Sequence, residues 1–380
     1  MEEKICLEYV WIDGYNELRS KIKIVQRCSI SLRLSLRSLS SFESEELKNI
    51  IPSWNFDGSS TGQAIGKESD VILKAVRAYK NPFFETCPSS FNNQSSLASS
   101  FLILCECFEK DDVTPHKSNT RNACEKAYEQ YKEHKCLFGI EQEYVLFERG
   151  RDQWAKDTMR MEDVPYKWVE HDEPGRGGQG PYYCSVGGDR SFGRSISDQH
   201  LLYCLKAGIE ICGTNAEVMA SQWEFQVGTC DALKVTDDLI MARYILHKIT
   251  EQYNCCASFH PKPYSGDWNG SGAHTNFSTK NMREEGGMSY IVAACDKLKD
   301  AHAEHIDVYG SYNEMRLTGI HETSSMNHFT WGVGNRGCSV RIPLHVSQNN
   351  CGYLEDRRPA SNCDPYTVVT KIMNTVCGQV

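Results

Sequence analysis

The stretch Phe138-Gly139-Ile140-Glu141-Gln142-Glu143-Tyr144-Val145-Leu146-Phe147 places two carboxylates, Glu141 and Glu143, inside an apolar and aromatic run. A short run of this composition is typical of a buried strand. Residues i and i+2 of a strand point to the same face, so both glutamates are expected on one face. Two carboxylates about 4 Å apart repel by about 4 kcal/mol at a moderate effective dielectric. A fold tolerates such a pair only where protons or cations neutralise it, so this strand is expected to line a divalent-metal site.

Two further glutamates occur in similar surroundings. Glu217 follows Gly213-Thr214-Asn215-Ala216, and Glu224 lies between Trp223 and Phe225 in a strand-like run. A single glutamate on a polar face is usually just solvated, but four in aromatic, strand-like contexts favour a shared site. Oxygen ligands select hard cations, so the sequence predicts Mg²⁺ or Mn²⁺.

His274 lies in the glycine-rich stretch Asn269-Gly270-Ser271-Gly272-Ala273-His274-Thr275-Asn276-Phe277-Ser278. A lone histidine is more often structural than a ligand. Small neighbours, however, let the backbone approach a bound ligand closely. A nitrogen ligand would favour Mn²⁺ without excluding Mg²⁺.

The region from residue 300 to 370 is rich in arginine and contains no lysine. Its arginines are Arg316, Arg336, Arg341, Arg357 and Arg358. Arginine is favoured where a carboxylate or phosphate needs a planar, two-pronged grip. Salt bridges to scattered acids are the alternative interpretation. Acidic metal ligands together with several arginines fit phosphoryl transfer from a metal-bound nucleotide.

Familiar nucleotide-binding loops do not account for such a site. No GxxxxGK[ST] motif occurs, and Gly175–Gly180 matches GxGxxG only in its letters. The residues before it do not resemble a strand and those after it do not resemble a helix, so the match is predicted to be a loop.

Composition indicates a large globular chain of 380 residues with a net charge of −9, which argues against a nucleic-acid partner. The longest apolar run, Phe101–Cys105, is too short to span a membrane, and no signal peptide is evident. The 18 cysteines contain no CxxC pair. Disulfides are the alternative, but scattered cysteines in apolar positions favour free thiols and a cytoplasmic location.

The pattern along the chain predicts a mixed α+β protein without internal repeats. The first ~110 residues are β-rich, a Ser/Asn-rich loop covers 86–100, and a domain boundary is expected near 109–118. The predicted strands are Tyr9–Ile12, Ile30–Leu36, Phe101–Phe108, Tyr182–Val186, Gln222–Val227 and Ser339–Ile342. The predicted helices begin at caps Ser118 (to His134), Asp198 (to Gly208) and Thr236 (to Tyr253), cover Met288–Ile306, and start again at Asp364-Pro365.

At this point the chain resembles glutamine synthetase of the eukaryotic type. The resemblance rests on Trp54–Thr61, Gly139–Tyr144, Asn215–Phe225, Pro261–Pro263, Trp268–Thr279, Arg316–Gly319, His321–Thr323, Asn335-Arg336, Gly352–Pro359, Asn362 and Asp364-Pro365, in the family's order. It implies a β-grasp-like N-terminal domain over 1–109. It also implies a catalytic domain over 110–380 with a curved antiparallel sheet flanked by helices.

The resemblance implies a reaction and a set of ligands. The side-chain carboxylate of L-glutamate attacks the γ-phosphate of ATP, and ammonia then converts the acyl phosphate to L-glutamine. At least two metal ions per site are implied, one held by Glu143, Glu217 and Glu224 and the other by Glu141, His274 and Glu355.

Other positions receive roles from the same resemblance. Asn269, Gly270 and Arg316 would hold glutamate, with Arg336 and Arg357 acting on both substrate and transferring phosphoryl group. ATP would contact Glu224, Asn276, Ser278, Arg283, Arg336, Arg341 and Tyr353.

Two further residues are implied to act in catalysis, and a homo-oligomer follows from one of them. Asp57 would take the proton from ammonium, and Glu322 would close over the site and exclude water. In the family Asp57 comes from a neighbouring subunit, so the resemblance implies two stacked pentameric rings with active sites between subunits.

One departure and three alternatives accompany this interpretation. Leu137 stands where the family usually has a tryptophan, which predicts weaker packing on adenine. The alternatives are a catalytically inactive structural relative, a ligase that joins glutamate to a bulkier amine, and a kinase of a small acid. The ligand positions, Asp57, Glu322 and the arginines are all present, which disfavours the first, and the acidic Asp57 disfavours the second.

Overall fold

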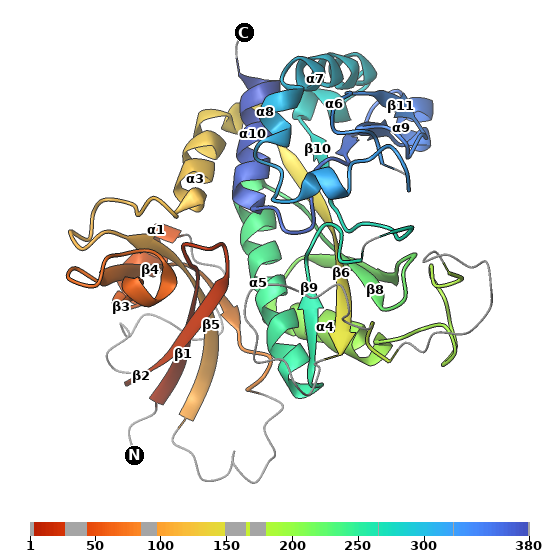
Figure 1. The fold of residues 1–380 in the computed structure, drawn as a ribbon. Helices are drawn as coiled ribbons and strands as arrows, with labels where there is room; N and C mark the ends of the chain where they lie inside the picture. Colours follow the sequence, from red (N-terminus) through yellow and green to blue (C-terminus); the bar gives the residue numbers. More distant parts are fainter. Residues whose placement is uncertain are drawn as a thin grey trace. The chain divides into compact units, whose positions relative to one another are not determined.

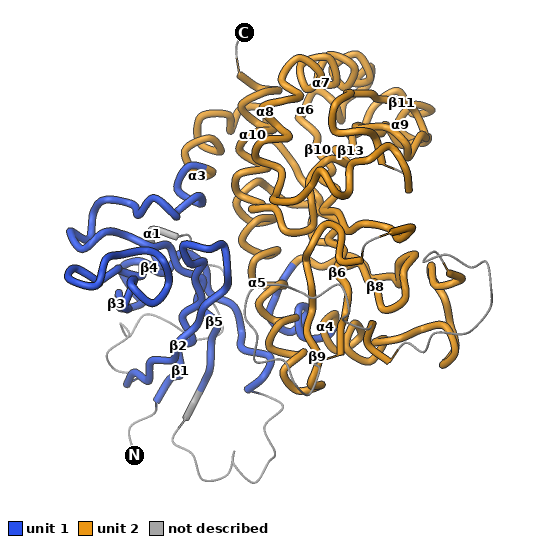
Figure 2. Tube along the Cα trace, in the orientation of Figure 1, with its two compact units in different colours: residues 1–123, 202–209 blue, residues 124–201, 210–380 orange. Residues whose placement is uncertain are grey.

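The computed structural model describes residues 4–26, 44–84, 97–148, 165–167, 180–264, 266–321 and 323–378 (Figure 1). The chain divides into two compact units, which Figure 2 colours separately. The first contains residues 1–123 and 202–209, and the second contains residues 124–201 and 210–380. The expected domain boundary at 109/110 stays a prediction, because a division into compact units does not test where an independently folding domain ends.

The first unit is built on a five-stranded sheet in the order β2-β1-β5-β4-β3. Its strands are β1 Lys4–Ile12, β2 Leu18–Gln26, β3 Trp54–Asp57, β4 Asp70–Lys80 and β5 Leu97–Phe108. Strands β1 and β5 run parallel, and the other neighbours are antiparallel. Helix α1 (Ser44–Ile50) buries Leu47 in the same core as Ile5, Leu7 and Tyr9. A mixed sheet with one packed helix agrees with the β-grasp-like prediction.

The second unit contains an eight-stranded sheet in the order β11-β12-β13-β10-β6-β8-β7, with β9 paired to β6. Its strands are β6 Leu137–Glu148, β7 Ile211–Ala216, β8 Gln222–Cys230, β9 Cys255–Ser258, β10 Ala273–Ser278, β11 Trp331–Val333, β12 Val340–Ile342 and β13 Leu354–Asp356. The predicted antiparallel sheet is observed with one exception, because β11 and β12 run parallel.

The helices that follow β5 belong mostly to the second unit, although residues 120–123 and 202–207 belong to the first. They are α3 Thr120–Gln130, α4 Arg194–Ala207, α5 Ala232–Gln252, α6 Lys280–Arg283, α7 Met288–Asp300, α8 His302–Ile306, α9 Leu344–Asn349 and α10 Pro365–Cys377. Figure 1 shows α5 and α10 side by side. The predicted cap of α10 is confirmed, because Asp364 Oδ1 accepts a hydrogen bond from Tyr366 N at 2.9 Å.

The helix starts predicted at Ser118, Asp198 and Thr236 are wrong, because each helix begins at a different residue. Helix α5 is capped by Asp231, which accepts hydrogen bonds from Leu233 N and Lys234 N, whereas Thr236 lies inside the helix. Helix α4 starts directly after Gly193, whose φ of +85° is not helical, so Asp198 is also internal.

The remaining differences are smaller. Asn119, rather than Ser118, accepts from a backbone amide of α3, at 3.2 Å from Asn122 N. The helix predicted over Met288–Ile306 is interrupted at Ala301. The strand predicted over Tyr182–Val186 is a turn with Cys184 at φ +50°.

The other predicted strands are confirmed where they are described. The start of β5 at Leu97 shortens the predicted 86–100 loop at its end. Ile30–Leu36, most of that loop, and Gly175 to residue 179 of the GxGxxG match lie outside the described residues. Within the described ranges, no helix combines the length and the apolar character needed to cross a membrane.

Candidate active site

The site is built on one face of β6 and its two neighbours. Glu143 lies directly opposite Glu224 of β8 in the antiparallel register. Glu141 lies opposite His274 of β10. Because side chains alternate along each strand, these four residues share a face of the sheet. The sequence-based expectation that Glu141 and Glu143 point the same way is therefore met.

The same row of residues extends to the sheet's outer strands. Glu355 of β13 lies between Asn276 of β10 and Arg341 of β12. On the other side, Asn215 of β7 lies opposite Glu224, and Glu217 follows two residues later. Residues that are far apart in the sequence are thus brought together by strand pairing alone.

The first cluster is Glu141, His274 and Glu355, whose candidate ligand atoms lie within 4.8 Å of one another. His274 Nδ1 is 3.5 Å from Glu141 Oε2 and 3.7 Å from Glu355 Oε1. Burial and the nearby Arg357 charge hold the pKa of His274 well below its usual value, so the ring is neutral at physiological pH. A neutral imidazole with two carboxylates is a donor set for a divalent cation.

The second cluster is Glu143, Glu217 and Glu224, whose ligand atoms also lie within 4.8 Å of one another. Burial, followed by the neighbouring carboxylates, raises the pKa of Glu224 to about 9. The same two causes raise the pKa of Glu217 to about 8, and burial raises that of Glu143. Three carboxylates that resist ionisation together fit a site where a cation supplies the missing charge.

Neutral donors hold the second cluster in place. Glu143 accepts from Gly272 N at 2.7 Å, Glu217 accepts from Asn215 Nδ2 at 2.9 Å, and Glu224 accepts from Gln226 Nε2 at 2.7 Å. A Cβ at position 272 would collide with the Arg316 guanidinium, so a larger residue there would have to displace that group. The glycine-rich stretch thus brings its backbone close to Glu143, while its predicted approach to a ligand stays a prediction.

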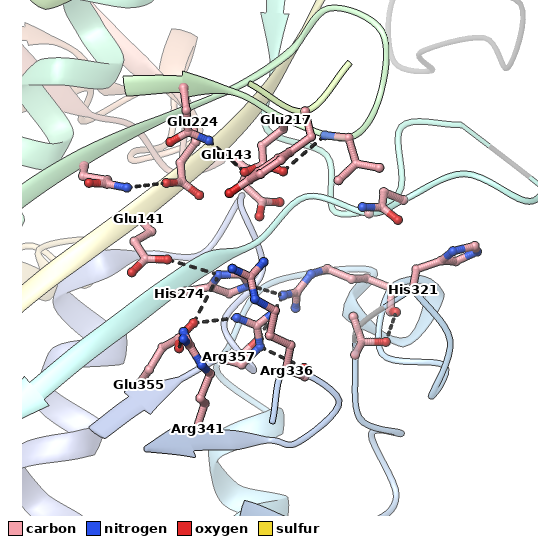
Figure 3. Close-up of a pocket in the computed structure, with 18 residues that line it drawn as sticks. Glu141, Glu143, Glu217, Glu224, His274, His321, Arg336, Arg341, Glu355 and Arg357 are labelled. Atoms are coloured by element: carbon pink, nitrogen blue, oxygen red, sulfur yellow. Dashed lines mark hydrogen bonds and ion pairs between the residues drawn. The ribbon is translucent and has the colours of Figure 1, made fainter. Parts of the chain in front are cut away.

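Both clusters face one cavity of about 560 Å³. Figure 3 shows Glu143, Glu217 and Glu224 on one side and Glu141, His274 and Glu355 on the other. The predicted substrate residues Asn269, Gly270, Arg316, Arg336 and Arg357 also line this cavity, as does Arg341.

The arginines are concentrated beside the first cluster. Glu355 accepts hydrogen bonds from Arg341 Nη1 at 2.8 Å and from Arg357 Nη1 at 2.6 Å. Arg316 donates to the Arg357 carbonyl at 2.9 Å, and burial lowers its pKa to about 10, so it remains charged near neutral pH. Arg358 differs, because it is 1% exposed and paired with the buried Asp356. The salt-bridge interpretation is therefore right for that arginine.

A second cavity of about 310 Å³ groups most of the residues predicted to contact ATP. Asn276, Ser278, Arg283 and Tyr353 line it, together with Leu137. Glu141 and Gln226 line both cavities, so the two adjoin at these residues. A slot next to an arginine-rich, acidic cavity is suited to a nucleotide whose phosphates reach the clusters.

The two predicted catalytic carboxylates outside this group are Asp57 and Glu322. Asp57 ends β3 in the first unit and accepts hydrogen bonds from Ser59 and Ser60, which lower its pKa to about 2. It is therefore ionised at neutral pH. Glu322 lies outside the described residues, although His321 and Thr323 line the larger cavity.

Some cavity residues were not identified as functional positions by the sequence analysis, among them Gln226, Asn215 and Tyr183. Gln226 shares a face with Glu224, so period-2 alternation could have identified it. Asn215 precedes Glu217 by two residues, but no pattern distinguished it from a turn asparagine. Tyr183 lines the cavity from a turn that was predicted to be a strand, so its direction was not predictable.

Comparison with known proteins gives a consistent result. Residues 117–378 match the family model described as "Glutamine synthetase, catalytic domain". The chain is 46% identical over 377 residues to the glutamine synthetase of Candida glabrata, covering 99% of this chain and 90% of that protein. It is 44% identical over 376 residues to the glutamine synthetase of Yarrowia lipolytica, covering 99% of this chain and 92% of that protein. It is 46% identical over 373 residues to the glutamine synthetase of Agaricus bisporus, covering 98% of this chain and 93% of that protein.

Proposed function

The chain belongs to the glutamine synthetase family and is a glutamate–ammonia ligase, and from this premise we propose how its residues divide the reaction. The observation that carries the proposal is that two three-residue acidic clusters face one cavity, with arginines on one side and an adjoining slot on the other. L-Glutamate, ATP and ammonium are the proposed substrates. L-Glutamine forms through a γ-glutamyl phosphate.

Each cluster is proposed to hold one Mg²⁺ or Mn²⁺. The donor sets support this, since one contains three carboxylates and the other adds a neutral imidazole. The raised pKa values of Glu217 and Glu224 also support it, because burial and mutual repulsion keep these carboxylates from ionising together unless a cation neutralises them. When bound, these cations would supply positive charge for phosphoryl transfer.

The arginines are proposed to bind and neutralise the substrates. Arg316, with Asn269 and Gly270, would hold the glutamate α-carboxylate end near the second cluster. Arg336 and Arg357 would contact the transferring phosphoryl group, and Arg341 the other phosphates. Glu355 already orients two of these guanidiniums, which supports their convergence on phosphate oxygens.

The nucleotide is proposed to occupy the smaller cavity. Asn276, Ser278, Arg283 and Tyr353 would seat it, with Glu224 reached from the adjoining cavity. Gly139 and Leu137 offer an apolar floor on which adenine can stack.

Asp57 is proposed to accept the ammonium proton. Its low pKa keeps it negative, so it attracts ammonium before it accepts the proton. Glu322 is proposed to exclude water from the acyl phosphate. We further propose that Asp57 acts in a neighbouring subunit's site, within a homo-oligomer of two pentameric rings, and that the protein is cytoplasmic. Among the described residues no two cysteines are joined by a disulfide, which supports a reducing compartment.

A phosphate-release assay tests the reaction directly. Purified protein with glutamate, ATP and Mg²⁺ should release phosphate and form glutamine only when ammonium is added, at a saturating concentration. Release driven equally by a bulkier amine would favour the alternative ligase. No release under any of these conditions would favour an inactive structural relative.

Subunit mixing tests the shared site. Asp57→Ala and Glu217→Ala proteins should each be inactive, but mixed subunits should recover about one quarter of wild-type activity, because a site is intact only when both contributing chains are unaltered there. No recovery after verified subunit exchange would place Asp57 and the clusters in the same chain.

A further inference from the structure

Two buried cysteines meet beside the smaller cavity. Cys136 directly precedes β6, and Cys377 is the last residue of α10. Their sulfur atoms lie 3.6 Å apart, and the residues are 5% and 8% exposed. They are 241 positions apart in the chain, so the contact depends on the folded second unit.

The two thiols are chemically unequal. Lys297 lies against the end of α10, where its Nζ donates to the Val376 carbonyl at 2.9 Å and to the Gly378 carbonyl at 3.3 Å. The hydrogen bond from Cys136, and then the Lys297 charge, lower the pKa of Cys377. The same hydrogen bond and burial raise the pKa of Cys136. The Lys297 ammonium beside the end of α10 therefore makes Cys377 the better thiolate, and this thiolate would accept the hydrogen bond from the Cys136 thiol.

We propose that Cys136 and Cys377 form a peroxide-sensitive dithiol whose oxidation to a disulfide ties the start of β6 to the end of α10. Burial of both sulfurs favours a small oxidant, and hydrogen peroxide fits this requirement. A disulfide has a sulfur–sulfur bond of about 2.05 Å, so the two sulfur atoms would approach each other by about 1.5 Å, which draws residues 135–137 toward the end of α10.

The chemistry proceeds in two balanced steps. The Cys377 thiolate attacks one peroxide oxygen, so an S–O bond forms, the O–O bond breaks and the departing hydroxide takes a proton to become water. The Cys136 sulfur then attacks the Cys377 sulfur, so the S–S bond forms, the S–O bond breaks and a second water leaves with the Cys136 proton. Two thiols are oxidised to one disulfide, and one peroxide is reduced to two waters.

The start of β6 connects this pair to the nucleotide cavity. Leu137, the next residue after Cys136, lines that cavity. Arg283 lines it too and donates to the Lys135 carbonyl at 2.7 Å and to Ser278 Oγ at 2.9 Å. Movement of residues 135–137 would therefore displace both the cavity wall and Arg283. Weaker nucleotide binding after oxidation is the expected result, and this part rests on the proposed function.

Disulfide mapping tests the pair itself. The folded protein is treated with hydrogen peroxide, remaining thiols are blocked with N-ethylmaleimide, and peptides are digested without reduction. We expect a cross-linked peptide pair containing Cys136 and Cys377 that disappears with dithiothreitol. Cys136→Ser should instead leave a Cys377 sulfenic acid that dimedone traps, whereas Cys377→Ser should give neither product.

A matched control is Cys255→Ser, which removes another buried thiol of the same unit and should leave the cross-link intact. Oxidation of other cysteines without this cross-link in the wild-type protein would overturn the proposal. That result does not depend on any variant folding correctly.

Calorimetric titration with ADP and Mg²⁺ tests the coupling. Oxidised protein should bind about tenfold more weakly than reduced protein, with recovery after dithiothreitol. The Cys377→Ser protein should bind equally before and after peroxide. Unchanged ADP affinity in protein shown to be cross-linked would overturn the coupling. Failure of glutamine formation by the reduced protein would count instead against the proposed function.

Discussion

The two acidic clusters of the second unit resemble each other in size but differ in what balances their charge. In the cluster Glu141, His274 and Glu355, Arg341 and Arg357 both contact Glu355. In the cluster Glu143, Glu217 and Glu224, each carboxylate accepts a hydrogen bond from a neutral amide group. Charge compensation is thus built into the first cluster and largely left to a ligand in the second.

This difference has a functional meaning. Under the proposed function, the arginines that already contact Glu355 bind phosphate, so the first cluster would be matched to an anionic substrate as well as to a cation. The second cluster, with the pKa of Glu217 near 8 and that of Glu224 near 9, gains its full negative charge only with a cation present. We therefore expect the second cluster to depend more strongly on metal than the first.

The largest effect is expected from removing a ligand of the second cluster. Glu217→Ala should lower metal-dependent glutamine formation by at least about 10³-fold, because one of the three carboxylate ligands proposed for this metal ion is lost. Oligomer assembly, measured by sedimentation, should be unchanged. Glu210→Ala, an exposed glutamate just before β7, is the matched control and should keep wild-type turnover. Near-normal turnover of Glu217→Ala would remove Glu217 from the ligand set.

A smaller effect is expected on the arginine side of the first cluster. Arg341→Met should lower kcat/KM for ATP by about 100-fold, because a charged contact to phosphate is lost. Mn²⁺ binding should not weaken, since Arg341 competes with a cation for Glu355. Weaker Mn²⁺ binding with unchanged ATP kinetics would reverse the roles that the comparison assigns.

The pH dependence of metal binding should separate the two clusters. Carboxylates with raised pKa values bind protons that a cation must displace, so Mn²⁺ affinity should rise with pH up to about 8 to 9. The gain should be about tenfold per pH unit for each proton released. Isothermal titration at pH 6.5 and 8.5 measures it, and Glu217→Gln should flatten the dependence.

The same pKa shifts predict the stability of the metal-free protein. A carboxylate whose folded-state pKa is raised stabilises the fold fully below its ordinary value of 4.5, and this contribution is lost as pH rises through the folded value. The melting temperature of the metal-free protein should therefore fall between pH 6 and pH 9. Added Mn²⁺ should raise this temperature more at pH 9 than at pH 6. A Mn²⁺ effect that is independent of pH would contradict the shifts.

The smallest effect is expected in the nucleotide cavity, away from both clusters. Leu137→Trp should lower the KM for ATP by about threefold, because an indole adds stacking area against adenine. Steady-state kinetics at saturating glutamate measure this change, and Mn²⁺ affinity should stay constant. A higher KM for ATP would mean that the cavity is too narrow for the larger ring.

Strand alternation made part of the site predictable from the sequence. Glu141 and Glu143 share a face because they are two residues apart in β6, and the Glu224–Gln226 pair follows the same rule. Which strands lie next to each other was not predictable from periodicity. His274 meets Glu141 only because β10 pairs with β6 in one register, and family resemblance supplied that grouping.

Element boundaries show a second limit. Asp231 and Thr236 both precede apolar helical residues, and the sequence does not reveal that the earlier one reaches the free amides of α5. Tyr183 was placed on a strand because its neighbours have β propensity, yet Cys184 adopts φ +50° and the segment turns. Local preference gave way to tertiary structure at both positions.

The central claim is that each cluster holds one divalent ion, and counting bound Mn²⁺ tests it most directly. Equilibrium dialysis with electron paramagnetic resonance detection should find two Mn²⁺ per wild-type chain and one per Glu217→Gln chain. Glu217→Gln combined with Glu141→Gln should bind none at the same free concentration. Two ions retained by the single and the double variant would show that the cations bind elsewhere.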